Sequence, residues 1–242
     1  MKLVFLDEVD STNNYARGLV TAENPEEGTV VLAQRQTGGR GQGKNVWESE
    51  PGENLTFSII WYPHFLPASE QFQLSRAVSL GLSDFLRTQT GGVSVKWPND
   101  LMIGRQKVAG ILLEHAVMGN RLHSTIAGIG LNLNQAAFPA HLPHAVSLSQ
   151  VTGRRYPLQE TLHQVLACLF RRYDDLRQGR IAEIEEDYRK NLFRIAEWSW
   201  FKAGGVTFEG RITGTDEFGR LLLEKWDGER ATYSLKEVEM VL

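Results

Sequence analysis

The chain has 242 residues, 42% of them hydrophobic and 23% charged, and its formal net charge at pH 7 is -3. This composition is typical of a soluble globular protein, and the charge argues against binding nucleic acid or an anionic membrane surface through bulk electrostatics. One cysteine, Cys168, excludes an intramolecular disulfide framework, and no apolar run is long enough to predict a signal peptide or a membrane span. We therefore expect a cytoplasmic protein without a membrane partner.

The N-terminal part of the chain alternates apolar strands with helices. The predicted elements are strands at 2–6, 29–34 and 54–62 and helices at 10–23 and 68–89. Ser11 or Thr12 is the expected N-cap of the first helix. The glycine-rich stretch at 35–53 reads as a long loop, and loops of this length in compact domains are usually functional or disordered.

The middle of the chain continues the mixed pattern. The elements predicted here are a strand, turn and strand over 93–103, strands over 107–117 and 121–134, and helices over 158–176 and 181–192. Gly119-Asn120 is a hairpin turn signal between the two longer strands. Together with the N-terminal elements, these predict an α/β (α+β) domain with a mixed β-sheet and flanking helices over residues 1–195.

After residue 196 the helical period disappears. Short β-rich segments such as VTFEGRIT and RLLLEKW are separated by turn signals such as Asp227-Gly228. About 45 residues of short strands predict a small antiparallel barrel. We assign residues 196–242 to this second domain.

Residues 38–45, GGRGQGKN, almost match the phosphate-binding P-loop pattern. Asn45 stands where that motif has a hydroxyl, and the next residues contain Pro51 and no helix pattern, so the helix N-terminus that would hold phosphate is missing. The loop carries Arg40, Lys44 and Trp47. It could close over a nucleotide, with cations on phosphates and the indole on the base, or be a solvated surface loop with a half-buried tryptophan.

The string Lys96-Trp97-Pro98-Asn99-Asp100 follows an apolar strand. Lys96 ends that strand and either contacts a partner or extends its ammonium group into water. Asp100 either caps the turn or has a functional role. The residues alone leave both alternatives open.

Taken together, the motifs resemble those of biotin–protein ligases (biotin–acetyl-CoA-carboxylase ligases), and the resemblance covers essentially the whole chain. The segments that carry it are Asp10–Asn13, Gln36–Gly41, Trp47–Ser49, Lys96–Asp100, Lys107–Glu114 and Gly128–Asn132. The Lys-Trp-Pro-Asn-Asp string is the most specific of them. The resemblance implies a mixed-sheet catalytic domain followed by an SH3-like barrel.

The resemblance also implies a reaction in two steps. Biotin and ATP, with Mg²⁺ on the nucleotide, form biotinyl-5′-AMP and pyrophosphate, and biotin is then transferred to one lysine of a biotin carboxyl carrier protein. No tightly bound prosthetic group is expected. Because Lys2 already begins the first catalytic strand, we expect the short form without an N-terminal DNA-binding domain, hence no nucleic-acid partner. A homodimer is possible through an exposed sheet edge.

The resemblance assigns roles to individual residues. Lys96 and Arg40 are the expected catalytic cations, which stabilise negative charge during attack of the biotin carboxylate on the α-phosphate, and Asp100 is expected to orient the acceptor lysine. The expected biotin-binding residues are Ser11, Thr12, Gln36, Gly39, Arg40, Lys96 and Gly110. The expected ATP- and adenylate-binding residues are Arg40, Trp47, Lys96, Asn99 and Asn132. No protein metal ligand is expected, since the six histidines have no zinc-site spacing.

Two alternatives remain. A lipoate- or octanoyl-protein ligase shares the catalytic fold, but the Lys96–Asp100 string and the polar set suited to a ureido group favour biotin. A non-catalytic sensor of biotin or its adenylate is the second alternative. It is supported by Gln42, which stands where relatives often have an arginine credited with retaining the adenylate.

Overall fold

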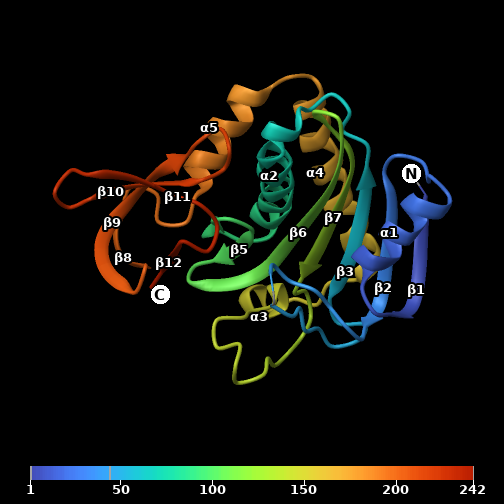
Figure 1. The fold of residues 1–242 in the computed structure, drawn as a ribbon. Coiled ribbons are helices and arrows are strands. Elements are labelled where there is room, and N and C mark those ends of the chain that lie inside the picture. The colour runs from blue at the N-terminus through green and yellow to red at the C-terminus, as the bar shows by residue number, and fades with distance from the viewer. Residues whose placement is uncertain (1, 44, 242) are drawn as a thin grey trace.

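The computed structural model describes residues 2–43 and 45–241. Lys44, which the sequence suggested as a secondary cation of the loop, lies outside them. The main sheet has seven strands in the order β1-β2-β3-β7-β6-β5-β4 (Figure 1). They are β1 (Leu3–Val9), β2 (Thr29–Gln36), β3 (Leu55–Trp61), β4 (Val93–Lys96), β5 (Asp100–Ile103), β6 (Gln106–Met118) and β7 (Arg121–Leu131). Only the β1–β2 pair is parallel among these neighbours.

Helices cover both faces of this sheet. They are α1 (Thr12–Ala22), the 3₁₀ helix η1 (Ala68–Glu70), α2 (Phe72–Gln89), α3 (Leu148–Thr152), α4 (Leu158–Arg177) and α5 (Ile181–Asn191). Ala16 of α1 packs with Ile60, whereas the adjacent residue Ile59 belongs to the large core that also contains residues of α2 and α4. Since neighbouring strand residues point to opposite faces, α1 lies on one face and α2 and α4 on the other.

A separate antiparallel sheet forms the C-terminal barrel, with strand order β11-β10-β9-β8-β12. Its strands are β8 (Trp198–Ala203), β9 (Val206–Thr215), β10 (Leu221–Lys225), β11 (Arg230–Tyr233) and β12 (Val238–Met240). The mixed α/β fold with a small C-terminal β-domain is thus confirmed. The boundary at residue 196 and pairing of two chains at the open β1 edge stay predictions.

The barrel contacts the mixed-sheet part of the chain through the turn between β9 and β10. Trp97 Nε1 donates to the carbonyl oxygen of Gly219 at 2.8 Å, and Arg76, which is 1% exposed, donates to the carbonyl oxygen of Asp216 at 2.6 Å. These contacts hold the barrel against helix α2 and the turn that follows β4. No described helix is long and apolar enough to cross a membrane.

The one helix that the sequence analysis missed is α3. It has five residues and a capping box between Ser147 and Gln150. Because so short a segment cannot display a helical apolar period, only that capping pattern could have revealed it.

Candidate active site

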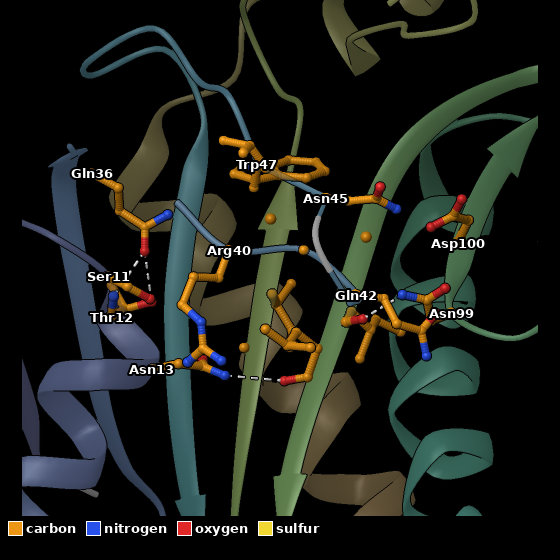
Figure 2. Close-up of a pocket in the computed structure, with 18 of the residues that line it drawn as sticks. Ser11, Thr12, Asn13, Gln36, Arg40, Gln42, Asn45, Trp47, Asn99 and Asp100 are labelled. Carbon is orange, nitrogen blue, oxygen red and sulfur yellow. Dashed lines mark hydrogen bonds between the residues drawn. The ribbon is translucent and has the colours of Figure 1, made fainter. Parts of the chain in front are cut away.

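A cavity of about 120 Å³ lies on the α1 side of the sheet, where β6 and β7 meet the start of α1 (Figure 2). Its walls come from four places: the N-terminus of α1, the end of β2, the glycine-rich loop and the turn before β5. The lining includes Ser11, Thr12, Asn13, Gln36, Arg40, Trp47, Asn99, Asp100, Lys107, Gly110 and Gly130. Segments far apart in the sequence therefore converge on one small space.

Hydroxyl and amide groups form one end of the cavity. Because β1 and β2 run parallel and Val9 pairs with Gln36, the end of β2 lies beside the start of α1. Gln36 Oε1 accepts from the backbone N–H of Thr12 at 2.8 Å and lies 3.1 Å from the Thr12 hydroxyl. The buried Ser11 is the N-cap of α1, yet its side chain makes no capping hydrogen bond, so its expected capping role is not used.

The floor of the cavity is formed by glycines of β6 and β7. A Cβ atom at Gly130 would overlap the indole of Trp47, and one at Gly128 would overlap the amide of Asn13. Glycine at these two places therefore lets an aromatic ring and a polar side chain lie directly on the sheet. Gly110 lines the same floor beside Lys107.

The glycine-rich loop folds back over the cavity as an irregular hairpin. The backbone N–H of Trp47 donates to the carbonyl oxygen of Gly39 at 3.0 Å, and the backbone N–H of Gly41 donates to the carbonyl oxygen of Asn45 at 2.8 Å. No helix occurs among the described residues between 45 and 54, which agrees with rejection of a P-loop. The indole nitrogen of Trp47 is buried and has no partner among the described residues.

Arg40 extends from this loop toward the polar end of the cavity. Its guanidinium forms an ion pair with Glu114 at 3.0 Å and donates to Asn14 Oδ1 at 2.9 Å. Glu114 also pairs with Arg17 at 2.6 Å. Burial alone would raise the pKa of the Glu114 carboxyl, but hydrogen bonds from Asn13 and Arg40 and the two arginine charges hold it below its usual value.

The other end of the cavity carries a lysine and a carboxylate. Lys107 Nζ lies 2.6 Å from Asp100 Oδ1 and 5.8 Å from the centre of the Trp47 ring. Asn99 lies beside them and donates to the carbonyl oxygen of Ile111 at 2.7 Å. Lys107 begins the Lys107–Glu114 segment of the family resemblance, but no role was predicted for it from the sequence.

Lys96 lies in a neighbouring cavity of about 590 Å³ between the turn after β4 and the barrel. Asp100 and Gln42 line both cavities, whereas Lys96 is absent from the described lining of the first. Burial lowers the pKa of the Lys96 amine, offset by the charge of Asp100. The structure thus places Asp100 between the two lysines and separates Lys96 from Ser11, Thr12 and Gln36.

Two other expected ligand contacts lie behind the cavity wall. Gly39 is buried under the carbonyl group of Trp47. Asn132 is 3% exposed, donates to the carbonyl oxygen of Val146, and its Oδ1 is buried without a partner among the described residues. Neither residue is in the described lining.

Within the described part of the chain, no group of three or more His, Cys, Asp or Glu side chains is placed to hold a metal ion. The charged side chains at the other end of the cavity from Thr12 and Gln36 are instead Lys107 and Asp100, and Lys96 lies in the neighbouring cavity. This set is suited to binding anions and orienting an amine.

Known proteins share both sequence and fold with this chain. Residues 5–132 match the model of the Biotin/lipoate A/B protein ligase family. The bifunctional ligase/repressor BirA of Bacillus spizizenii is 33% identical over 96% of this chain and 72% of its own length. The biotin–[acetyl-CoA-carboxylase] ligase of Paracoccus denitrificans is 32% identical over 90% of this chain and 92% of its own.

Solved structures agree with the sequence relatives. The biotin protein ligase from Aquifex aeolicus in complex with biotin and ATP superposes with a TM-score of 0.81 at 27% identity, covering 99% of this chain and 98% of that one. The resemblance to biotin–protein ligases is therefore confirmed, and the chain belongs to the biotin/lipoate A/B protein ligase family.

Proposed function

We propose that the protein is an ATP-dependent biotin–protein ligase that forms biotinyl-5′-AMP and transfers biotin to a lysine of a carrier protein. The observation that carries this function is the division of one cavity into two chemically different ends. Hydroxyl and amide groups of Thr12 and Gln36 lie at one end, and the Lys107–Asp100 pair lies at the other. Biotin has the matching polarity, with a ureido ring at one end and a carboxylate at the other.

The first step is attack of the biotin carboxylate on the α-phosphate of ATP. Two anions must approach each other, so the step depends on fixed positive charge rather than on an enzyme nucleophile. Lys107 is better placed for this role than Lys96, because Lys107 lines the same cavity as Thr12 and Gln36 and Lys96 lines the neighbouring one. Lys96 is then a second cation on the side of the barrel, facing the phosphates or the carrier. Mg²⁺ would enter with ATP as part of the substrate, because the residues of the site that the structure describes form no cage of carboxylates for it.

The second step requires a neutral lysine amine beside the acyl carbon. Asp100 is the proposed group to orient that amine, because it lies where the two cavities meet and thus where a side chain from outside can reach the acyl group. The ion pair with Lys107 also holds the Asp100 carboxylate at this end of the cavity. Trp47, Asn99 and Asn132 remain the proposed contacts of the nucleotide.

Ligand binding requires movement of the loop. A volume of about 120 Å³ is smaller than the about 300–1,000 Å³ usual for small-molecule sites. The indole of Trp47 lies on the glycine floor and occupies part of the space that the ligand needs. We propose that Trp47 and residues 39–47 shift when biotin enters and then close over the adenylate.

The function is tested by incubating the protein with biotin, ATP, Mg²⁺ and a biotin carboxyl carrier domain. Pyrophosphate release and a biotinylated lysine, found by mass spectrometry, are the expected products. A carrier with its target lysine replaced by arginine should allow adenylate formation and receive no specific biotin. Lipoate in place of biotin should give no product, because its dithiolane ring offers neither an N–H nor a carbonyl group to Thr12 and Gln36. Modification with lipoate alone would assign the protein to the other branch of the family.

A further inference from the structure

Hydrogen bonds beneath the polar end of the cavity form a continuous chain. It runs through Glu114, Asn13, Ser58, Thr12 and Gln36. Ser58 is fully buried, and Asn13 is 3% exposed. Glu114 and Ser58 are outside the set of described residues that line the cavity. These two side chains can therefore affect a ligand only through their neighbours.

The amide of Asn13 has one orientation that its neighbours accept. Its Nδ2 lies 2.8 Å from Glu114 Oε2 and 3.3 Å from the carbonyl oxygen of Leu112, and both of these oxygens only accept. The amide oxygen consequently faces Ser58, whose Oγ lies 2.6 Å away. Glu114 makes the shorter contact, and hydrogen bonds to a charged group are about twice as strong as neutral ones. The carboxylate is thus the main determinant of the orientation.

Each hydroxyl has a single proton, so the short contacts determine where it points. Ser58 donates to Asn13 Oδ1, which cannot donate. Thr12 Oγ1 lies 2.8 Å from Ser58 Oγ and 3.1 Å from Gln36 Oε1. Because the Ser58 proton is already used and Gln36 Oε1 only accepts, the Thr12 proton stays within this chain of contacts. Thr12 presents lone pairs, and no proton, to the cavity.

Gln36 is oriented independently of Glu114. Its Oε1 accepts from the backbone N–H of Thr12 at 2.8 Å, and a backbone N–H can only donate. Its Nε2 consequently points away from Thr12 toward the middle of the site (Figure 2). The polar end offers an acceptor at Thr12 beside a donor at Gln36, which complements the N–H and the C=O of a cyclic urea.

We propose that Glu114 and Ser58 are positioning residues that make Thr12 an obligate hydrogen-bond acceptor and thereby select a ligand ring with an N–H at that place. This inference rests on the proposed function, in which biotin is the ligand. Neither residue touches the ligand, and the recognition of the ring carbonyl by Gln36 does not depend on them.

Replacing Glu114 by glutamine changes the polarity of the chain while nearly conserving shape. Glu114 Oε1 accepts from Arg17 at 2.6 Å and from Arg40 at 3.0 Å, and Oε2 accepts from Asn13 at 2.8 Å and from Arg40 Nη1 at 3.1 Å. Both arginines only donate and two of their three contacts are to Oε1, so in Glu114→Gln the amide oxygen takes the Oε1 place and the NH₂ group faces Asn13. Arg40 Nη1 loses its contact with Oε2 but keeps Asn14 Oδ1 as an acceptor.

The introduced NH₂ group and Asn13 Nδ2 are both donors and then face each other. The Asn13 amide therefore turns over, and its Nδ2 donates to Ser58 Oγ. This releases the proton of Ser58 toward Thr12, so Ser58 no longer accepts from Thr12. Thr12 then has only the 3.1 Å contact with Gln36 Oε1 as an acceptor within the chain of contacts, and it can donate to the ligand in place of that contact.

The test uses two cyclic carbamate analogues of biotin, in each of which one ring N–H is replaced by oxygen. Calorimetric titration of the wild type should show that one isomer, with its ring oxygen facing Thr12, binds about 10- to 100-fold more weakly than biotin, because two acceptors meet. In Glu114→Gln the ratio of that isomer's Kd to that of biotin should fall toward one. Ser58→Ala should lower the same ratio, since it interrupts the chain between Asn13 and Thr12.

Arg17→Met is the matched control. It removes one ion pair from Glu114 but keeps the carboxylate beside Asn13, so it should retain the wild-type ratio. The ratio of the two Kd values is informative because a general loss of structure weakens the binding of the carbamate isomer and of biotin alike and leaves the ratio unchanged. If Glu114→Gln keeps the wild-type ratio, the inference is overturned, even if Ser58→Ala fails to fold. Wild-type protein that binds no biotin overturns the proposed function instead, so the two failures are distinguishable.

Discussion

Replacement of Lys107 by methionine tests the proposed chemistry most directly. The change removes the ammonium group but keeps an unbranched apolar side chain of similar length. Two unit charges about 4 Å apart interact by about 4 kcal/mol at an effective dielectric constant of about 20. Loss of one group that stabilises developing charge costs about 10²–10³ in rate in comparable sites. We expect the rate of pyrophosphate release in Lys107→Met to fall by about that factor at saturating biotin and ATP.

The stability of this variant should hardly change. Lys107 and Asp100 are 36% and 22% exposed at their side chains, so their ion pair contributes at most about 1 kcal/mol. That corresponds to a decrease in Tm of no more than roughly 2–4 °C for a chain of this size. A large rate loss at nearly constant Tm would therefore report on chemistry rather than on folding.

Lys96→Met is the control for position, because it removes the same group from the neighbouring cavity. We expect it to reduce adenylate formation less than Lys107→Met does. Both variants are compared by single-turnover formation of biotinyl-5′-AMP. Near wild-type adenylation in Lys107→Met, together with its loss in Lys96→Met, would refute the reasoning and return the role to Lys96.

Four further outcomes are expected. Asp100→Asn should form biotinyl-5′-AMP normally but transfer it slowly to the carrier, and normal transfer would contradict the role given to Asp100. Biotin should change tryptophan fluorescence in the wild type and not in Trp47→Phe, since Trp47 lies on the cavity floor; an equal change in both would place the motion elsewhere. Gln42→Arg adds a cation where the two cavities meet, so the adenylate should dissociate more slowly, as measured by its release on a desalting column. Burial lowers the pKa of His115 to about 4, whereas the pKa of an unperturbed histidine is about 6.5. The unfolded state therefore binds the proton more readily, and the free energy of unfolding decreases as the pH drops below about 6.5. Between pH 7 and 5 this loss is about 2 kcal/mol by linkage, and urea unfolding of His115→Gln should show a smaller loss than the wild type.

Much of the fold and of the polar end of the site could be predicted from sequence because local rules determine them. The first helix begins directly after the first strand, so Ser11 and Thr12 have to lie at its N-terminus. Gln36 ends the next strand, and parallel pairing of β1 with β2 places Val9 against it. The first step is local, and the second depends only on the pairing of β1 and β2 across the intervening helix α1.

The reactive end could not be predicted in the same way. In a regular strand, Lys107 and Gly110 are three residues apart and would point to opposite faces. A register shift between β5 and β6, where Leu101 pairs with Ala109 but Met102 pairs with Lys107, changes that alternation. Val108 and Ala109 are consequently both fully buried, and Lys107 lines the same cavity as Gly110. A bulge of this kind has no signal in a short apolar sequence.

Strand β6 connects the two ends of the site. Lys107, Gly110 and Glu114 follow one another along it, and β6 is hydrogen-bonded to β5 and β7 on its two sides. The seven residue-to-residue steps from Lys107 to Glu114 span roughly 23 Å of strand, from which side chains at both ends reach inward. Because a paired central strand is rigid, the distance between Lys107 and Glu114 is fixed before ligand binds. In the proposed function the part of the site that moves is the loop, described over residues 39–43 and 45–47, and its movement changes access to the cavity without changing the separation of the two ends.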